Sequence, residues 1–81
     1  MARYSVETKR TPEQVIEMAE AYFGAGGLGL DAAEQGPCCV HFEGGGGYVS
    51  VTASVGENKT AVDLETREWD YPVRQFMRAV A

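Results

Sequence analysis

The sequence predicts a single α+β domain over residues 1–81, with a five-stranded, mostly antiparallel sheet and both helices packed on one of its faces. Two patterns carry this prediction. Five segments alternate apolar and polar side chains with the period of two that is typical of half-buried strands. Two others repeat apolar residues at the period of an amphipathic helix. In chain order these segments give β-α-β-β-β-β-α.

The chain begins with a predicted strand over residues 3–9, in which Tyr4, Val6 and Thr8 alternate with polar side chains. A helix start follows at Thr11, because this hydroxyl, a proline in the next position and Gln14 three residues after the cap form a capping box. We expect the helix to end at Gly24. Its apolar side chains are Val15, Ile16, Met18, Ala19, Tyr22 and Phe23.

Four further strands are predicted in the middle of the chain, at residues 28–35, 38–43, 48–55 and 60–67. Turn residues separate them: Gly36-Pro37, the four glycines of Gly44–Gly47, and residues 56–59. Consecutive strands joined by such short turns should pair antiparallel. Because a helix follows the first strand, we expect that strand to lie beside the fifth.

The last helix is predicted from Asp70 and Pro72 to Ala81. It carries an apolar stripe opposite Arg74 and Arg78. The stripe consists of Val73, Phe76, Met77 and Val80.

The alternation divides the sheet into two faces. The residues expected to face the helices are Tyr4, Val6, Val40, Phe42, Val49, Val51, Val55, Val62 and Leu64. Those expected on the outer, polar face are Ser5, Glu7, Cys39, His41, Glu43, Tyr48, Ser50, Thr52, Asp63, Glu65 and Arg67.

Composition restricts the function. Twelve acidic residues against seven basic ones give a net charge of −5, which argues against nucleic acid as a partner because phosphates need Lys and Arg. The first residues hold no long apolar run, so we expect neither a signal peptide nor a membrane span. Cys38 and Cys39 are adjacent, and neighbouring strand residues point to opposite faces, so we expect both thiols to be reduced and the protein to be cytoplasmic.

The element order resembles one repeat of the TATA-box-binding-protein-like fold, which is also the core of helix-grip (START-like) ligand-binding proteins. Residues 42–49 and 65–71 are similar to segments of small uncharacterised bacterial proteins of this topology. Two departures stand out. Helix-grip proteins enclose a ligand under a long C-terminal helix, which is short here, and the DNA-binding relatives do not carry the acidic outer face predicted for this chain.

Two glycine-rich segments are similar to motifs that bind cofactors or anions. Residues 24–29 match G-x-G-x-x-G, but a dinucleotide site needs a strand before this motif and a helix after it, and here the order is reversed. Gly44–Gly47 has neither a following lysine nor a helix behind it, so a hairpin turn is favoured over an anion site. We expect no cofactor.

Several side chains that could bind a metal or take part in catalysis also have purely structural interpretations. Cys38, Cys39, His41 and Glu43 suggest a soft-metal or redox site, but four ligands with zinc-site spacing are not present, so a buried Cys38 and a surface His41 are favoured. Glu43 with acidic neighbours on the outer face (Asp63, Glu65) lacks the desolvated pocket that acid–base catalysis needs. We expect no metal site, no catalytic residues and no enzyme.

The favoured function is therefore a binding or interaction module that forms a homodimer, since a core of this size supplies only about 3–5 kcal/mol. The alternative is a helix-grip-type carrier of a small apolar ligand. Candidate interface or ligand-lining residues are Ile16, Tyr22, Phe23, Trp69, Tyr71 and Phe76.

Overall fold

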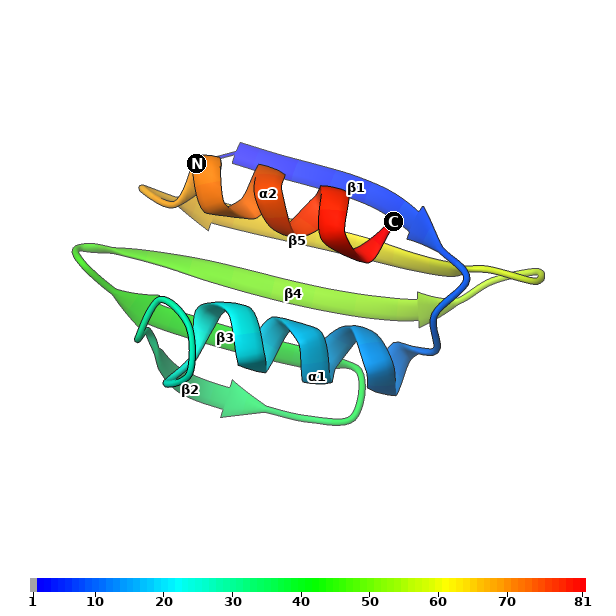
Figure 1. Cartoon of the computed structure of the whole chain (residues 1–81), viewed down its shortest axis with the longest axis horizontal. Coiled ribbons are helices and arrows are strands. Elements are labelled where there is room, and N and C mark those ends of the chain that lie inside the picture. Colours follow the sequence, from blue (N-terminus) through cyan, green and yellow to red (C-terminus); the bar gives the residue numbers. More distant parts are fainter. Residues whose placement is uncertain (1) are drawn as a thin grey trace.

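The computed structural model describes residues 2–81 and has the predicted element order. The strands are β1 (Ala2–Thr8), β2 (Asp31–Gln35), β3 (Cys39–Gly44), β4 (Gly47–Val55) and β5 (Thr60–Arg67). The helices are α1 (Pro12–Phe23) and α2 (Asp70–Val80). Figure 1 shows both helices in front of the same face of one sheet.

The five strands form one sheet in the order β1-β5-β4-β3-β2, and all four pairings are antiparallel. The prediction that the first strand lies beside the fifth is therefore confirmed. In Figure 1, α1 lies over the β3–β4 half of the sheet and α2 over the β5–β1 half. This division leaves a seam between the two helices above the middle of the sheet.

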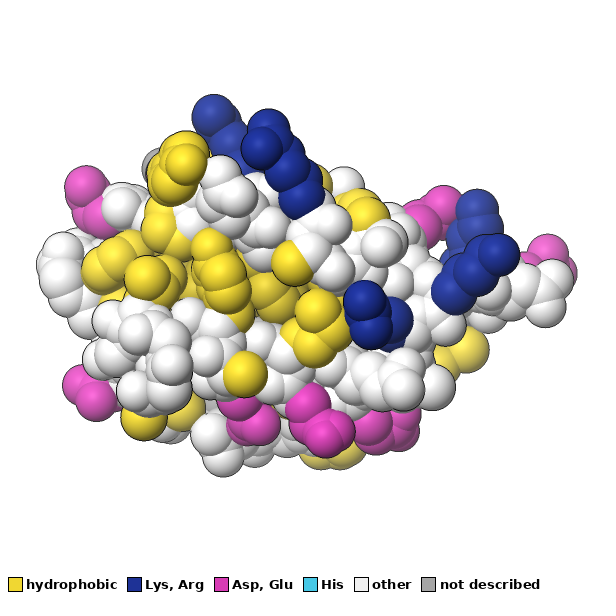
Figure 2. Space-filling model, in the orientation of Figure 1, with side chains coloured by type: hydrophobic (Ala, Val, Ile, Leu, Met, Phe, Trp, Pro, Cys, Tyr) yellow, Lys and Arg dark blue, Asp and Glu magenta, His cyan; other side chains and the backbone are white. Residues whose placement is uncertain are grey.

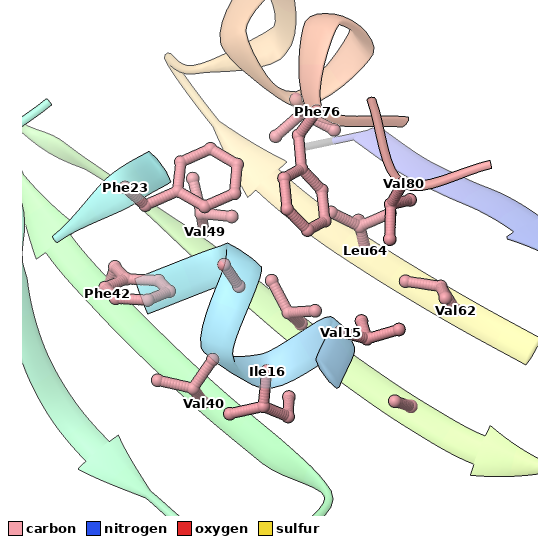
Figure 3. Close-up of a cluster of buried hydrophobic side chains, with 14 of the residues drawn as sticks. Val15, Ile16, Phe23, Val40, Phe42, Val49, Val62, Leu64, Phe76 and Val80 are labelled. Carbon is pink, nitrogen blue, oxygen red and sulfur yellow. The ribbon is translucent and has the colours of Figure 1, made fainter. Parts of the chain in front are cut away.

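The core fills the space between the sheet and the helices. Phe23 lies between Phe42 of the sheet and Phe76 of α2, with ring centroids 5.6 and 5.2 Å apart, respectively. Figure 3 shows these aromatic rings meeting the aliphatic side chains of β4 and β5. The hydrophobic residues that form this core are 0–7% exposed. Burial of this apolar surface is the main stabilising term of the fold.

The helix boundaries follow the predicted local signals. Gln14 donates its backbone N–H to the Thr11 hydroxyl at 3.2 Å, and the Gln14 side chain accepts from the Thr11 N–H at 2.9 Å. This reciprocal capping box fixes the start of α1. Helix α1 ends at Phe23, and Gly24 is its C-cap.

The β3–β4 hairpin turns on two residues rather than four. Gly44 pairs with Gly47, and Gly45 and Gly46 between them have φ angles of 58° and 79°. A two-residue turn with both φ values positive matches the right-handed twist of its strands and strongly favours glycine. The hairpin prediction is confirmed, and the turn fixes the register of the whole outer face.

Two details of the strand prediction were wrong. The second strand begins at Asp31 rather than Leu28, because Gly29 has a φ of 81° and the Leu30 N–H bonds back to the last residue of α1. Val55, expected in the core, is 78% exposed. The alternation along β4 places Val55 on the face toward the helices. The end of β4 runs past the helices, however, so no helix covers this residue (Figure 1).

Candidate functional site

The helical layer presents an apolar seam between α1 and α2. Tyr22 of α1 lies with its ring 5.8 Å from Phe76 of α2, measured between centroids. Figure 2 shows hydrophobic side chains exposed along this line over the left and central part of the face. Partly buried hydrophobic residues of the two helices that pack against the core are Met18, Tyr22 and Met77, with Trp69 just before α2.

The six predicted interface or ligand-lining residues divide into two sets. Ile16, Phe23 and Phe76 are 7%, 0% and 1% exposed, so this chain's own core covers them. Tyr22 and Trp69 are half-buried, and Tyr71 is 71% exposed. Only the second set is accessible to another molecule.

Trp69 and Tyr71 have different surroundings at the start of α2. The Trp69 indole N–H donates to the Gly44 carbonyl at 2.9 Å, which ties the start of α2 to the β3–β4 hairpin. Tyr4 adds a second tie, since its hydroxyl donates to the Asp70 carboxylate at 2.8 Å. Tyr71, by contrast, is mostly exposed to solvent and adds no such tie.

Charges of opposite sign flank the seam. Glu13 and Glu17 of α1 are exposed, and so are Arg74 and Arg78 of α2. In Figure 2, carboxylates gather along the edge of α1 away from α2, and basic side chains rise over α2. Helix α2 also carries the favourable charge distribution for its dipole, with Asp70 in its first turn and Arg78 in its last. The face is therefore acidic on one side, apolar in the middle and basic on the other side.

The outer face of the sheet carries a chain of polar contacts centred on His41. The Nδ1 atom of His41 lies 2.6 Å from the Ser50 hydroxyl, and Nε2 lies 3.2 Å from a Glu43 carboxylate oxygen. A carboxylate only accepts, so Nε2 carries a proton, and in the neutral ring Nδ1 accepts from Ser50. The ring also stacks on Tyr48, with centroids 5.4 Å apart and an interplanar angle of 24°.

A second pair of contacts continues this chain across β4 and β5. The Tyr48 hydroxyl donates to the Glu65 carboxylate at 2.7 Å, and Arg3 lies 3.3 Å from the other oxygen of that carboxylate. The hydrogen bond to the negatively charged Glu65 is the main cause that raises the pKa of Tyr48 above its ordinary value. The outer face thus holds an ordered polar array rather than a set of unrelated solvated side chains.

The expectation of two reduced cysteines was wrong, since the structure joins Cys38 and Cys39 by a disulfide between adjacent residues. Their Cα atoms are 3.8 Å apart, as in any two residues joined by a trans peptide bond. The two side chains can meet because Cys38 precedes β3 and is not constrained to the alternation of a regular strand. Cys38 is also exposed rather than buried, while Cys39 is half-buried. The reduced thiols that favoured a cytoplasmic location are therefore not observed, and that location stays a prediction.

The disulfide, His41 and Ser50 line one open hollow of about 360 Å³ on the outer face, between β2, β3 and β4. Ser50, His41 and Glu43 are connected in the order of a hydrolytic triad, but Ser50 lies in the middle of a central strand, where ladder pairing engages its backbone. It therefore lacks the preorganised backbone N–H donors that stabilise an oxyanion. Within residues 2–81, no group of three or more His, Cys, Asp or Glu side chains is arranged to hold a metal ion.

The glycine-rich connection after α1 satisfies the end of that helix. The N–H groups of Gly27 and Gly29 both donate to the Gly24 carbonyl, and the Leu28 N–H donates to the Tyr22 carbonyl. Since these N–H groups are already engaged, they do not form a cradle for a phosphate. The segment acts as a helix-to-strand connection.

No family model and no curated protein matches this chain. The resemblance to TATA-box-binding-protein-like and helix-grip proteins therefore stays a prediction. In the part of the chain that the structure describes, neither helix is long and apolar enough to cross a membrane.

Proposed function

We propose that this protein is an interaction module that forms a homodimer through its helical layer. The observation that carries the proposal is the order of side chains across that layer, which is acidic on α1, apolar in the seam and basic on α2 (Figure 2). A surface of this kind is complementary to a second copy of itself.

The apolar part supplies the reason for association. Tyr22 and Met18 stay partly exposed although they pack against the core, and Tyr71 exposes most of its ring. Aromatic side chains and methionine are enriched in the buried centres of protein interfaces. Covering them would add apolar burial to a core that is small for an independent domain.

The charged part selects one geometry. In a symmetric dimer the same surface meets itself across a two-fold axis. An axis along the seam places α1 of one copy opposite α2 of the other, so that Glu13 and Glu17 meet the partner's basic helix with Arg74 and Arg78. An axis across the seam would instead place each helix against itself and bring like charges together. We therefore propose the first arrangement.

The carrier of a small apolar ligand has less support from the geometry. Such a protein needs an enclosed cavity that is largely formed before binding. Here the space beneath the helices is filled by fully buried Phe23, Phe42 and Phe76 and by the aliphatic residues around them (Figure 3). A ligand there would have to displace core side chains.

Sedimentation analysis over a range of micromolar concentrations tests the dimer. We expect the wild type to shift from monomer to dimer as concentration rises, and Arg78→Glu to weaken this shift because the new carboxylate faces the partner's acidic helix. Arg67→Glu is the matched control, since Arg67 is exposed on the outer face and should leave association unchanged. A wild type that stays at 8.8 kDa throughout would refute the proposal.

The proposed direction of the two-fold axis has a sharper test. A chain with Arg74→Glu and Arg78→Glu has two acidic helices, and a chain with Glu13→Arg and Glu17→Arg has two basic ones. Neither should self-associate, but an equimolar mixture should form a heterodimer, because each helix then faces an opposite charge. Homodimers of either variant would contradict the proposed axis.

A further inference from the structure

We propose that the Cys38–Cys39 disulfide on the outer face is a reversible redox couple that exchanges with dithiols. The proposal is independent of the dimer, because it concerns the opposite face of the sheet. It starts from two sulfur atoms held at a fixed place in an open hollow beside an imidazole.

The backbone holds both cysteines in position. The Cys38 carbonyl accepts from the Ala53 N–H of β4 at 2.8 Å, and the Cys39 carbonyl accepts from the Gly36 N–H at 2.8 Å. The disulfide is therefore anchored to the central strand on one side and to the turn before it on the other. Reduction need not disturb the sheet, because these bonds involve backbone atoms only.

The two sulfurs differ in access. Cys38 is exposed, whereas Cys39 is half-buried and lies on the strand face that also holds His41. Residues two apart on a strand are about 6–7 Å apart along it, and Cys39 and His41 line the same hollow. An incoming thiolate thus reaches Cys38 first, and Cys39 is the leaving group.

The exchange balances in two steps. A thiolate of the dithiol attacks Sγ of Cys38, which forms a mixed disulfide and breaks the Cys38–Cys39 bond, and the electron pair remains on Sγ of Cys39. That thiolate takes a proton from water. The second thiolate of the reductant then attacks its own sulfur in the mixed disulfide and releases Cys38 as a thiolate, which is protonated from water. The protein gains two electrons and two protons, and the dithiol becomes a cyclic disulfide.

Adjacency of the two cysteines makes a dithiol the preferred reductant. After the first step the freed Cys39 thiolate is the direct neighbour of the mixed disulfide, so its effective concentration is high and it tends to re-form the original bond. With a monothiol, a second molecule must attack the mixed disulfide before the Cys38–Cys39 bond re-forms. A dithiol completes the exchange within the same complex.

Thiol counting by mass spectrometry on the folded wild-type chain tests the couple. After mild oxidation we expect no reaction with N-ethylmaleimide, and after dithiothreitol we expect two maleimide groups per chain. Glutathione at the same thiol concentration should leave most chains unmodified. Two maleimide groups on the oxidised sample, no reduction without denaturant, or equal responses to the two reductants would overturn the proposal.

Discussion

The two faces of the sheet use the same alternation of residues for opposite purposes. On the inner face of β4, Val49 and Val51 are 0% and 1% exposed beneath the helices. One residue along, Ser50 on the outer face lies 2.6 Å from the imidazole of His41. The inner face is dry and close-packed, and the outer face is open and joined by directed polar contacts.

This difference separates stability from chemistry. Burial of apolar side chains depends on covered area, so the inner face needs helices above it. Hydrogen bonds and ion pairs at an exposed surface contribute little net free energy of folding. The outer face can therefore carry titratable and sulfur-containing groups without much effect on the fold, and substitutions on the two faces should differ sharply in their cost.

The largest expected effect comes from a charge on the inner face. Val51→Asp would place a carboxylate without a partner in the core, and the cost should exceed the total stability of about 5 kcal/mol that small domains have. We expect the variant to be unfolded by circular dichroism. Ser54→Asp is the control, because Ser54 is exposed on the outer face of the same strand. Similar melting temperatures for both variants would mean that the faces are inverted.

The β3–β4 turn allows a comparison at neighbouring positions. Both Gly45 and Gly46 have positive φ, so alanine at either site should cost about 1 kcal/mol. A Cβ on Gly45 would also lie 2.7 Å from the Trp69 ring, whereas a Cβ on Gly46 would have no neighbour within 4 Å. We expect Gly45→Ala to lower the denaturation midpoint clearly more than Gly46→Ala. Equal losses would show that Trp69 does not hold the turn.

A smaller effect is expected within the outer array. Ser50→Ala removes the hydrogen bond to His41, and the half-buried imidazole can take a water in its place, so the cost should be about 1 kcal/mol. Ser54→Ala, at an exposed site of the same strand, should change the free energy of unfolding by less than about 0.5 kcal/mol. Urea denaturation measures both. A loss at Ser50 as large as that of a core truncation would break the contrast between the faces.

The smallest effect concerns alkaline pH. Because the folded-state pKa of Tyr48 is raised, its contribution to stability is fully present below the unfolded pKa of about 10 and is lost as pH rises through the folded pKa. Tyr48→Phe lacks this ionisation. We therefore expect the urea midpoint of the wild type to fall more steeply than that of the variant between about pH 9 and pH 11. Parallel profiles would show that the bond to Glu65 does not form.

Most of the fold could be predicted because local and long-range signals agree. The capping box at Thr11 and Gln14 and the glycine hairpin act within a few residues, and the apolar alternation of β3, β4 and β5 is uninterrupted. Residues 28–35 were harder, because every residue of β2 is exposed and an edge strand without a buried side has no alternation to recognise. The start of β2 depends on the hydrogen bond from the Leu30 N–H to the carbonyl at the end of α1, which the sequence does not reveal.

The candidate site could be predicted only in part. The sequence placed His41, Glu43, Ser50, Tyr48 and Glu65 on one face, but their pairing depends on register. A signal for it was present, since a hairpin centred on Gly45–Gly46 sets Ser50 opposite His41. The disulfide was missed because the regular alternation assumed for a strand places neighbouring side chains on opposite faces. Exposure of Tyr71 depends on where α2 lies, which is a property of the whole fold.

Hydroxyl-radical footprinting over a range of protein concentrations tests most directly the claim that the helical layer binds a partner while the outer face stays open. We expect Tyr71 and Met18 to become protected as concentration rises, because the second copy covers them. Reactivity of His41 and Tyr48 should stay constant over the same range. Protection of His41 and Tyr48, or no protection of Tyr71 and Met18 at any concentration, would contradict the account.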